Sequence, residues 1–164
     1  MTTGAGTTTE TITVTTPFPA GVTAQAVLNS LHDHETYIKT TCPGFATQKH
    51  LFGSAVLGQP CGYEITAKRG NPNNPSTMMT TTFKMTLTNV VEGVDAVVES
   101  DTPLGEMVVR SRWRVSSVGG PGGSLEEVVD IEGSNKVTKQ LVKTNVEKSH
   151  SEYHNAFIAE ASRG

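Results

Sequence analysis

The C-terminal stretch NKVTKQLVKTNVEKSHSEYHNAFIAEAS, residues 135–162, is the longest segment that the sequence predicts to be a single helix. Lysines, Lys139 among them, occupy much of the surface between apolar side chains that recur at helix-like intervals. Short β-like segments precede this helix, and a compact helical stretch at Thr23–Thr41 precedes them. The order predicts a curved sheet around a final helix, with a ligand-sized cavity between them. The apolar positions of the helix are Val137, Leu141, Val146, Tyr153, Phe157 and Ile158.

Alternating side chains, with glycine- or proline-rich turns between them, predict six to seven antiparallel strands. Two short helices are expected after the first strand, the first capped by Thr23 and the second closed near Pro43. The segment GGPGG (residues 119–123) is expected to be a hairpin turn and not a phosphate-binding loop. The fold class is therefore α+β. The expected strands are Glu10–Thr16, Ala46–Phe52, Cys61–Arg69, Thr77–Thr88, Val94–Ser100, Glu106–Val115 and Leu125–Ile131.

Length and composition favour one domain, residues 10–164, preceded by a disordered tail, Met1–Thr9. A net charge of -3 gives no general attraction to nucleic acid or to anionic membranes. No apolar run approaches the roughly 20 residues that span a bilayer, so no membrane insertion is expected. The tail lacks the features of a secretory signal, and Cys42 and Cys61 lack metal-site spacing. Reduced thiols and a cytoplasmic location are predicted, with a disulfide between the two cysteines as the alternative.

Thr13–Phe45 contains the sequence TVTTPFPAGVTAQAVLNSLHDHETYIKTTCPG, which resembles the opening of START-like helix-grip proteins. This SRPBCC superfamily includes polyketide cyclases, plant Bet v 1-like proteins and lipid-transfer domains. Its members often have a strand, a proline-marked turn, a helix ending in Leu-x-Asp, and an aromatic residue in a second short helix. Leu31, Asp33 and Tyr37 occupy those places. In element order the resemblance covers nearly the whole chain, and it is greatest to uncharacterised fungal members.

The resemblance implies a protein that holds an apolar or aromatic small molecule, without a cofactor, as a monomer or homodimer. It implies cyclisation, dehydration or isomerisation of that molecule, of the kind found in secondary metabolism. A non-catalytic carrier of a lipid or hydrophobic metabolite is the alternative. The superfamily has no universal catalytic set, so catalytic residues have to be sought among the polar groups that face the cavity.

Glu127 is the first candidate. If Leu125, Val129 and Ile131 face inward, Glu127 faces inward with them. Burial would then raise its pKa and suit it to acid–base catalysis. A one-residue shift would instead turn Val128 inward and Glu127 outward.

Histidines supply the other candidate proton-transfer groups. His34, or His150 in the final helix, is a possible base or relay, because imidazole titrates near neutral pH. His150 and His154 are four residues apart and project from one helical face. The segment HSEYH lacks the glutamate of HExxH, and a metal would need a third ligand such as His50 or Glu127. We therefore predict no metal, and the alternative for this pair is two histidines at the surface or rim.

A further set of predicted inward-facing residues combines aromatic side chains with adaptable methionines, as small-molecule pockets do. Simple core packing is the alternative for several of them. The predicted ligand-binding residues are Tyr63, Met79, Phe83, Met85, Met107, Trp113, Tyr153 and Phe157.

Three arginines alternate with the inward residues of one strand and are expected to face outward. A basic stripe could bind phosphate or nucleic acid, but no aromatic residues interleave it. Across the GGPGG hairpin, Arg114 would lie near Glu126, and Arg110 near Asp130. Cross-strand ion pairs are the favoured interpretation, and no nucleic-acid partner is expected.

Overall fold

The computed structural model describes residues 8–70, 73–102, 105–117, 123–133 and 135–163. The α+β order predicted from the sequence is confirmed, and strand boundaries differ from the prediction by a few residues at most. Most of the predicted tail and of the GGPGG turn lies outside the described residues. The elements are β1 (Thr8–Pro17), α1 (Ala24–His32), α2 (His34–Thr41), β2 (Phe45–Phe52), β3 (Pro60–Arg69), a short 3-10 helix (Pro75–Thr77), β4 (Met79–Val90), β5 (Gly93–Thr102), β6 (Gly105–Ser116), β7 (Ser124–Gly133) and α3 (Lys136–Arg163).

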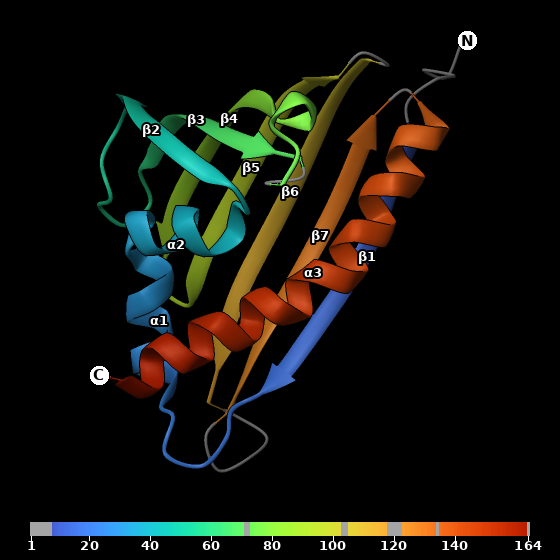
Figure 1. Cartoon of the computed structure of the whole chain (residues 1–164). Coiled ribbons are helices and arrows are strands. Elements are labelled where there is room, and N and C mark those ends of the chain that lie inside the picture. Colours follow the sequence, from blue (N-terminus) through green and yellow to red (C-terminus); the bar gives the residue numbers. More distant parts are fainter. Residues whose placement is uncertain (1–7, 71–72, 103–104, 118–122, 134, 164) are drawn as a thin grey trace, which may run out of the picture.

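The strands form one seven-stranded antiparallel sheet in the order β1-β7-β6-β5-β4-β3-β2. β2 to β7 form a meander, and β1 closes the sheet beside β7. The sheet curves around α3, which crosses its concave face with α1 and α2 beside its C-terminal half (Figure 1). α3 packs chiefly on β1, β7, α1 and α2.

The two short helices are separated by a shared cap. Thr23 accepts a hydrogen bond from the backbone N–H of Ala26 at 3.2 Å, which confirms it as the cap of α1. Asp33 ends α1, and its side chain accepts from the backbone N–H of Thr36 at the start of α2. This second cap lets the chain turn without leaving the first helical N–H groups of α2 unpaired.

The core lies between the concave face and the helices. Trp113, Phe157 and Leu31 are among its largest fully buried side chains, and both cysteines are buried free thiols. The predicted free thiols are confirmed, and the alternative disulfide between them is absent from this structure. None of the described helices has the length and hydrophobicity of a membrane-spanning helix.

The predicted inward face of α3 is only partly right. Val137 and Leu141 are 64% and 61% exposed, whereas Lys139 is buried. At about 100° per residue, Lys139 lies roughly 20° from the buried Val146 around the helix, and Val137 lies about 180° away. The N-terminal turns of α3 therefore present a different set of residues to the sheet from the one predicted.

Candidate functional site

Glu127 is fully buried on the concave face of β7. It pairs across the sheet with Val14 of β1 and with Trp113 of β6. The neighbouring Val128 is only partly buried. The predicted inward orientation of Glu127 is confirmed, and the alternative register is wrong.

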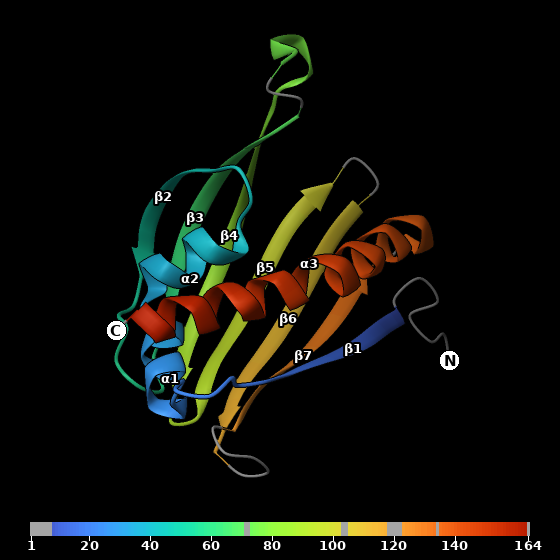
Figure 2. The ribbon, with the colours of Figure 1, turned by 60° about the horizontal axis from the view of Figure 1, so that its bottom comes forward.

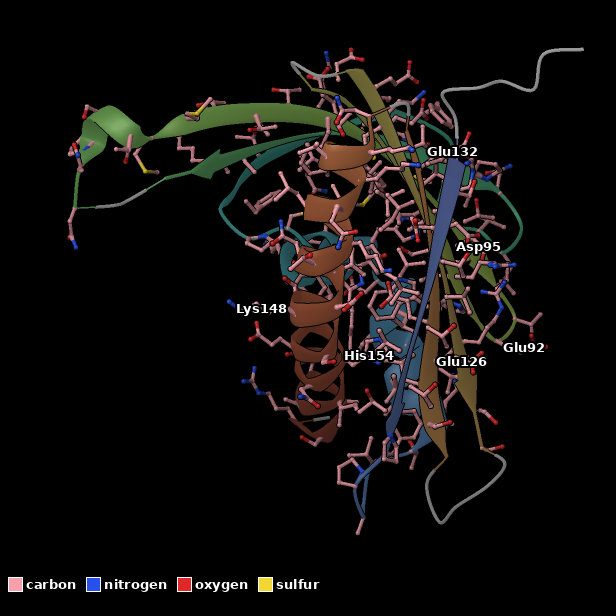
Figure 3. All side chains as sticks on the ribbon, turned by 90° about the vertical axis from the view of Figure 1, so that its right-hand side faces the viewer. Glu92, Asp95, Glu126, Glu132, Lys148 and His154 are labelled. Atoms are coloured by element: carbon pink, nitrogen blue, oxygen red, sulfur yellow. The ribbon has the colours of Figure 1, made fainter. Side chains whose placement is uncertain are left out.

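Two histidines of α3 bind this carboxylate. Nδ1 of His150 lies 2.7 Å from Oε2 of Glu127, and Nε2 of His154 lies 3.0 Å from Oε1. His154 is fully buried, and its Nδ1 lies 3.0 Å from the hydroxyl of Thr16. Figure 3 shows His154 on the sheet-facing side of α3, while Lys148 points away from the sheet. The alternative of two histidines at the surface or rim is therefore wrong for His154, which is fully buried.

The pKa of Glu127 is lowered, contrary to the prediction from burial. Burial does raise the pKa of this carboxyl, but hydrogen bonds from His150 and His154, with their favourable charge interaction, outweigh it. Glu127 is therefore ionised at neutral pH and can only accept hydrogen bonds. It follows that His150 carries a proton on Nδ1 and His154 carries one on Nε2. Among the described residues, no group of three or more potential ligands is arranged to hold a metal ion.

Aromatic rings enclose this cluster. The Trp113 ring stacks on His150, with ring centroids 6.3 Å apart, and lies 5.0 Å from the ring of His154. The Tyr153 ring also contacts His150, with ring centroids 4.9 Å apart. Burial raises the pKa of the Tyr37 phenol well above its usual value, and the negative charge of Glu127 adds to the rise. Tyr37 is therefore a neutral hydroxyl at every physiological pH.

His150 differs from His154 in one respect that matters for chemistry. Its side chain is 15% exposed, whereas that of His154 is fully buried. Within the described part of the chain, Nε2 of His150 makes no hydrogen bond. The cluster therefore presents one unoccupied imidazole nitrogen, oriented through Nδ1 by a buried carboxylate.

His34 belongs to a different hydrogen-bonded group. Its Nε2 lies 3.0 Å from Oδ1 of Asn89, whose amide nitrogen donates to two backbone carbonyls. Asn89 therefore presents its oxygen to His34, so Nε2 carries the proton and Nδ1 accepts from the Tyr63 hydroxyl at 2.9 Å. Cys61 donates in turn to that hydroxyl at 3.2 Å. His34 is buried with both ring nitrogens occupied, so it does not share the Glu127 cluster.

This arrangement predicts a pH-dependent stability. Burial lowers the pKa of His34, and the hydrogen bond to Asn89 and the charge of Asp33 offset this only in part. The unfolded chain therefore takes up a proton first as the pH falls below 6.5, and the free energy of unfolding decreases until the folded-state pKa is passed. Urea denaturation between pH 8 and pH 5 should give a shallower decrease for His34→Gln than for the wild type. The exposed His50 supplies the control, since His50→Gln should keep the wild-type slope. Equal slopes for all three proteins would contradict the assignment.

The predicted ligand-binding residues fall into three groups. Tyr63, Met85, Met107, Trp113 and Phe157 are buried, while Phe83 and Tyr153 are partly buried against the core. Met79 is 70% exposed, so its predicted inward position is wrong. β4 pairs with β5 only from Lys84 onward, and Met79 lies in the part of the β3–β4 hairpin that projects beyond the sheet (Figure 2).

The concave face is less densely covered toward the tips of β5 and β6. Val98 and Val109 face inward there, opposite each other in the sheet, yet both are only partly buried. A cavity of about 390 Å³ lies where β4 and β5 diverge. Leu51, Phe83 and Ser100 line it together with polar and charged residues from β3 to β6, and none of the described lining residues comes from α3. This cavity is therefore mainly polar and lies apart from the Glu127 cluster, so it is not the cavity predicted between the sheet and α3.

The arginines of β6 form ion pairs on the convex face. The predicted register is confirmed, with Arg110 opposite Asp130 and Arg114 opposite Glu126. The ion pairs themselves are diagonal: Arg110 with Glu132, Arg112 with Asp130 at 3.5 Å, and Arg114 with Asp95 at 2.8 Å. Figure 3 shows Asp95, Glu126 and Glu132 on the sheet face away from α3.

Solved structures with this architecture are numerous. Ara h 8.0201 is 15% identical, with 97% of this chain and 100% of that chain covered at a TM-score of 0.60. Norcoclaurine synthase from Thalictrum flavum, solved with dopamine and hydroxybenzaldehyde, is 12% identical, with 95% and 90% covered at a TM-score of 0.57.

The di-domain ARO/CYC protein BexL of the BE-7585A biosynthetic pathway is 11% identical at a TM-score of 0.57. The alignment covers 94% of this chain but 49% of BexL, so the chain spans about half of that protein. At these identities the likeness establishes the fold, which is the Bet v 1-like helix-grip fold.

Comparisons by sequence give fewer matches than comparisons by structure. No curated protein sequence matches this chain. The profile of one family, described as a domain of unknown function, matches residues 7–163. Because that match spans nearly the whole sequence, the protein is a member of the DUF7053 family.

Proposed function

We propose that this protein binds an apolar or aromatic small molecule on its concave face and catalyses a proton-transfer reaction on it. Isomerisation, dehydration and cyclisation are reactions of this kind that a histidine base can promote. The observation that carries the proposal is the buried Glu127 carboxylate bound to Nδ1 of His150, which leaves Nε2 of the same ring unoccupied.

The Glu127–His150 pair has the parts of a general base. The carboxylate fixes the tautomer and the ring orientation of the histidine, and it stabilises the imidazolium that forms when Nε2 takes a proton. A proton acceptor held in this way typically contributes about 10²–10⁴-fold to a rate. Binding the substrate in its reactive conformation would supply further acceleration.

The surroundings favour an apolar or aromatic ligand. Trp113 and Tyr153 flank His150, and the partly buried Phe83, Val98 and Val109 extend the apolar surface across β4 to β6. Two of the similar folds have names that refer to aromatic ligands or to a cyclase, which supports this ligand class by analogy only. A cytoplasmic location, a monomeric or dimeric state, a fungal source and a role in secondary metabolism stay predictions.

Deuterium exchange into an enolisable aryl ketone such as 2-tetralone, followed by NMR in D₂O, tests the proposed base. The wild type should accelerate exchange at the carbon next to the carbonyl, and His150→Ala should reduce that acceleration about 10²–10³-fold. Lys148→Ala is the matched control, since Lys148 lies on the same helix but points away from the sheet. Exchange unaffected by His150→Ala would overturn the assignment of the base.

Binding is measured separately, by displacement of the fluorescent probe 1-anilinonaphthalene-8-sulfonate and by native mass spectrometry with the same ketones. Binding of apolar ketones without any exchange would favour the non-catalytic carrier. Absence of both binding and exchange across the panel would contradict the proposed ligand class.

A further inference from the structure

The Glu127 cluster extends beyond the proposed base into a chain of four side chains. Thr16 of β1, His154 of α3, Glu127 of β7 and His150 of α3 are linked in that order at 3.0, 3.0 and 2.7 Å. Thr16 and His154 are 138 residues apart in sequence. The edge strand, its neighbour and the closing helix therefore meet at one hydrogen-bonded group.

The direction of each hydrogen bond follows from the carboxylate. An ionised Glu127 accepts at both oxygens, so Nε2–H of His154 donates to Oε1. Nδ1 of a neutral His154 is then an acceptor, and the Thr16 hydroxyl donates to it. With both rings neutral, the two histidines hold opposite tautomers, with the proton on Nδ1 in His150 and on Nε2 in His154.

Two hydrogen-bond partners fix the orientation of the Glu127 carboxylate more firmly than one partner would. The terminal torsion of a glutamate side chain is broad, so a single hydrogen bond leaves its carboxylate free to turn. His154 holds Oε1 and thereby fixes the plane in which Oε2 meets His150. Thr16 in turn holds the His154 ring in place, because its hydroxyl donates to the Nδ1 that remains unprotonated when Nε2–H donates to Glu127.

We propose that Thr16 and His154 are positioning residues that set the Glu127 carboxylate so that His150 keeps its proton on Nδ1 and a free electron pair on Nε2. The assignment of His150 as the reacting base rests on the proposed function, whereas the hydrogen-bond order does not.

The charge balance is consistent with one reactive histidine. With both imidazoles neutral the cluster carries a single negative charge, and a proton taken up at Nε2 of His150 neutralises it. A second proton on His154 would place a positive charge beside the first and would displace the Thr16 hydrogen. Among the described neighbours of the cluster, the Tyr37 phenol and the Trp113 indole are neutral and add no competing charge.

The test compares Thr16→Val, which removes the hydroxyl at nearly constant volume, with Thr16→Ser, which retains it. ¹⁵N NMR of the histidine rings in the wild type should show the two opposite tautomers. Thr16→Val should shift the ¹⁵N resonance of Nδ1 of His154, which loses its hydrogen-bond donor, or leave that ring protonated, and Thr16→Ser should restore the wild-type spectrum. A proton on Nδ1 of neutral His154 in the wild type would overturn the proposal, and so would identical spectra for the two variants.

Kinetics add a second measurement. In the deuterium-exchange assay Thr16→Val should lower kcat about tenfold, with KM nearly unchanged and with a shifted pH profile, because groups that orient a ligand or base typically contribute 10–100-fold. Thr16→Ser should recover both values. If the wild type shows the tautomers but no exchange, the proposed function fails and the positioning role stands. If exchange depends on His150 but not on Thr16, the positioning role fails and the proposed function stands.

Discussion

Replacement of Trp113 by alanine is expected to lower the free energy of unfolding by about 3–5 kcal/mol, the range typical of deleting a large aromatic side chain from a core. Trp113 is fully buried, and its ring contacts those of Tyr37 and Phe157 at centroid distances of 5.6 and 5.3 Å. It therefore joins α2, α3 and the sheet at one point. Urea denaturation followed by circular dichroism would measure the loss as a lower midpoint.

The Trp113→Phe variant distinguishes the contribution of the aromatic ring to stability from that of the indole N–H. Nε1 of Trp113 is buried without a hydrogen bond of good geometry among the described residues and acts only weakly on the nearby Tyr37 phenol, so removing it has a small cost. The phenylalanine variant should lose roughly half as much stability as the alanine variant or less. Arg112→Ala, at an exposed ion pair on the opposite face of the same strand, should change stability by no more than about 0.5 kcal/mol. A midpoint for Trp113→Ala equal to that of Arg112→Ala would show that the helices do not pack on this residue.

The strands of the sheet could be predicted because the patterns that mark them lie within short stretches of sequence. Side chains of a strand alternate between two faces, and glycine- and proline-rich segments mark where each strand ends. The same alternation predicts that Glu127 faces inward. Leu125, Glu127 and Val129 are alternate residues of one strand, so they point to the same face of the sheet, and Leu125 and Val129 are buried. The ambiguity created by Val128 was resolved only by pairing with β1 and β6.

The helix was less predictable because apolar content alone does not fix which face is buried. Val137 and Leu141 are apolar and exposed, whereas Lys139 is buried. Angular position around the helix gives the correct face, since His150 and His154 lie about 40° and 80° from Val146. That angle was the available signal that both histidines point inward.

The partners of the candidate site carried only part of the signal locally. Thr16 continues the inward row of Ile12 and Val14, but only the crossing of α3 over β1 selects it as the partner of His154. Asn89 was likewise unremarkable until the fold brought it to His34. Contacts between residues that are distant in sequence depend on how elements pack, which a single sequence does not encode in any short window.

Replacement of Glu127 by glutamine is expected to remove most of the proton-transfer activity, by about 10²–10⁴-fold in kcat. Glutamine keeps the shape but offers one acceptor and one donor in place of two acceptors. If its amide nitrogen faces His150, that ring must accept at Nδ1 and carry its proton on Nε2, so the base is lost. If the amide nitrogen faces His154 instead, the bond to Thr16 is disturbed and His150 loses the negative charge that stabilises its imidazolium. The 2-tetralone exchange assay measures the effect, and retained activity in Glu127→Gln would remove the carboxylate from the proposed mechanism.

The same variant has a stability signature whose sign follows from the lowered pKa of Glu127. A carboxyl with a folded-state pKa below its usual 4.5 stabilises the fold fully above that pH, and this contribution is lost as the pH falls through the folded-state value. At pH 7 Glu127→Gln should therefore be less stable than the wild type by about 1–3 kcal/mol, the cost of losing charged hydrogen bonds to buried groups. Below about pH 4.5 the two unfolding free energies should converge, because protonation removes the charge from the wild type as well. Urea denaturation at pH 7 and at successively lower pH measures the difference, and a gap independent of pH would mean that the buried carboxylate is not held in its ionised form by His150 and His154.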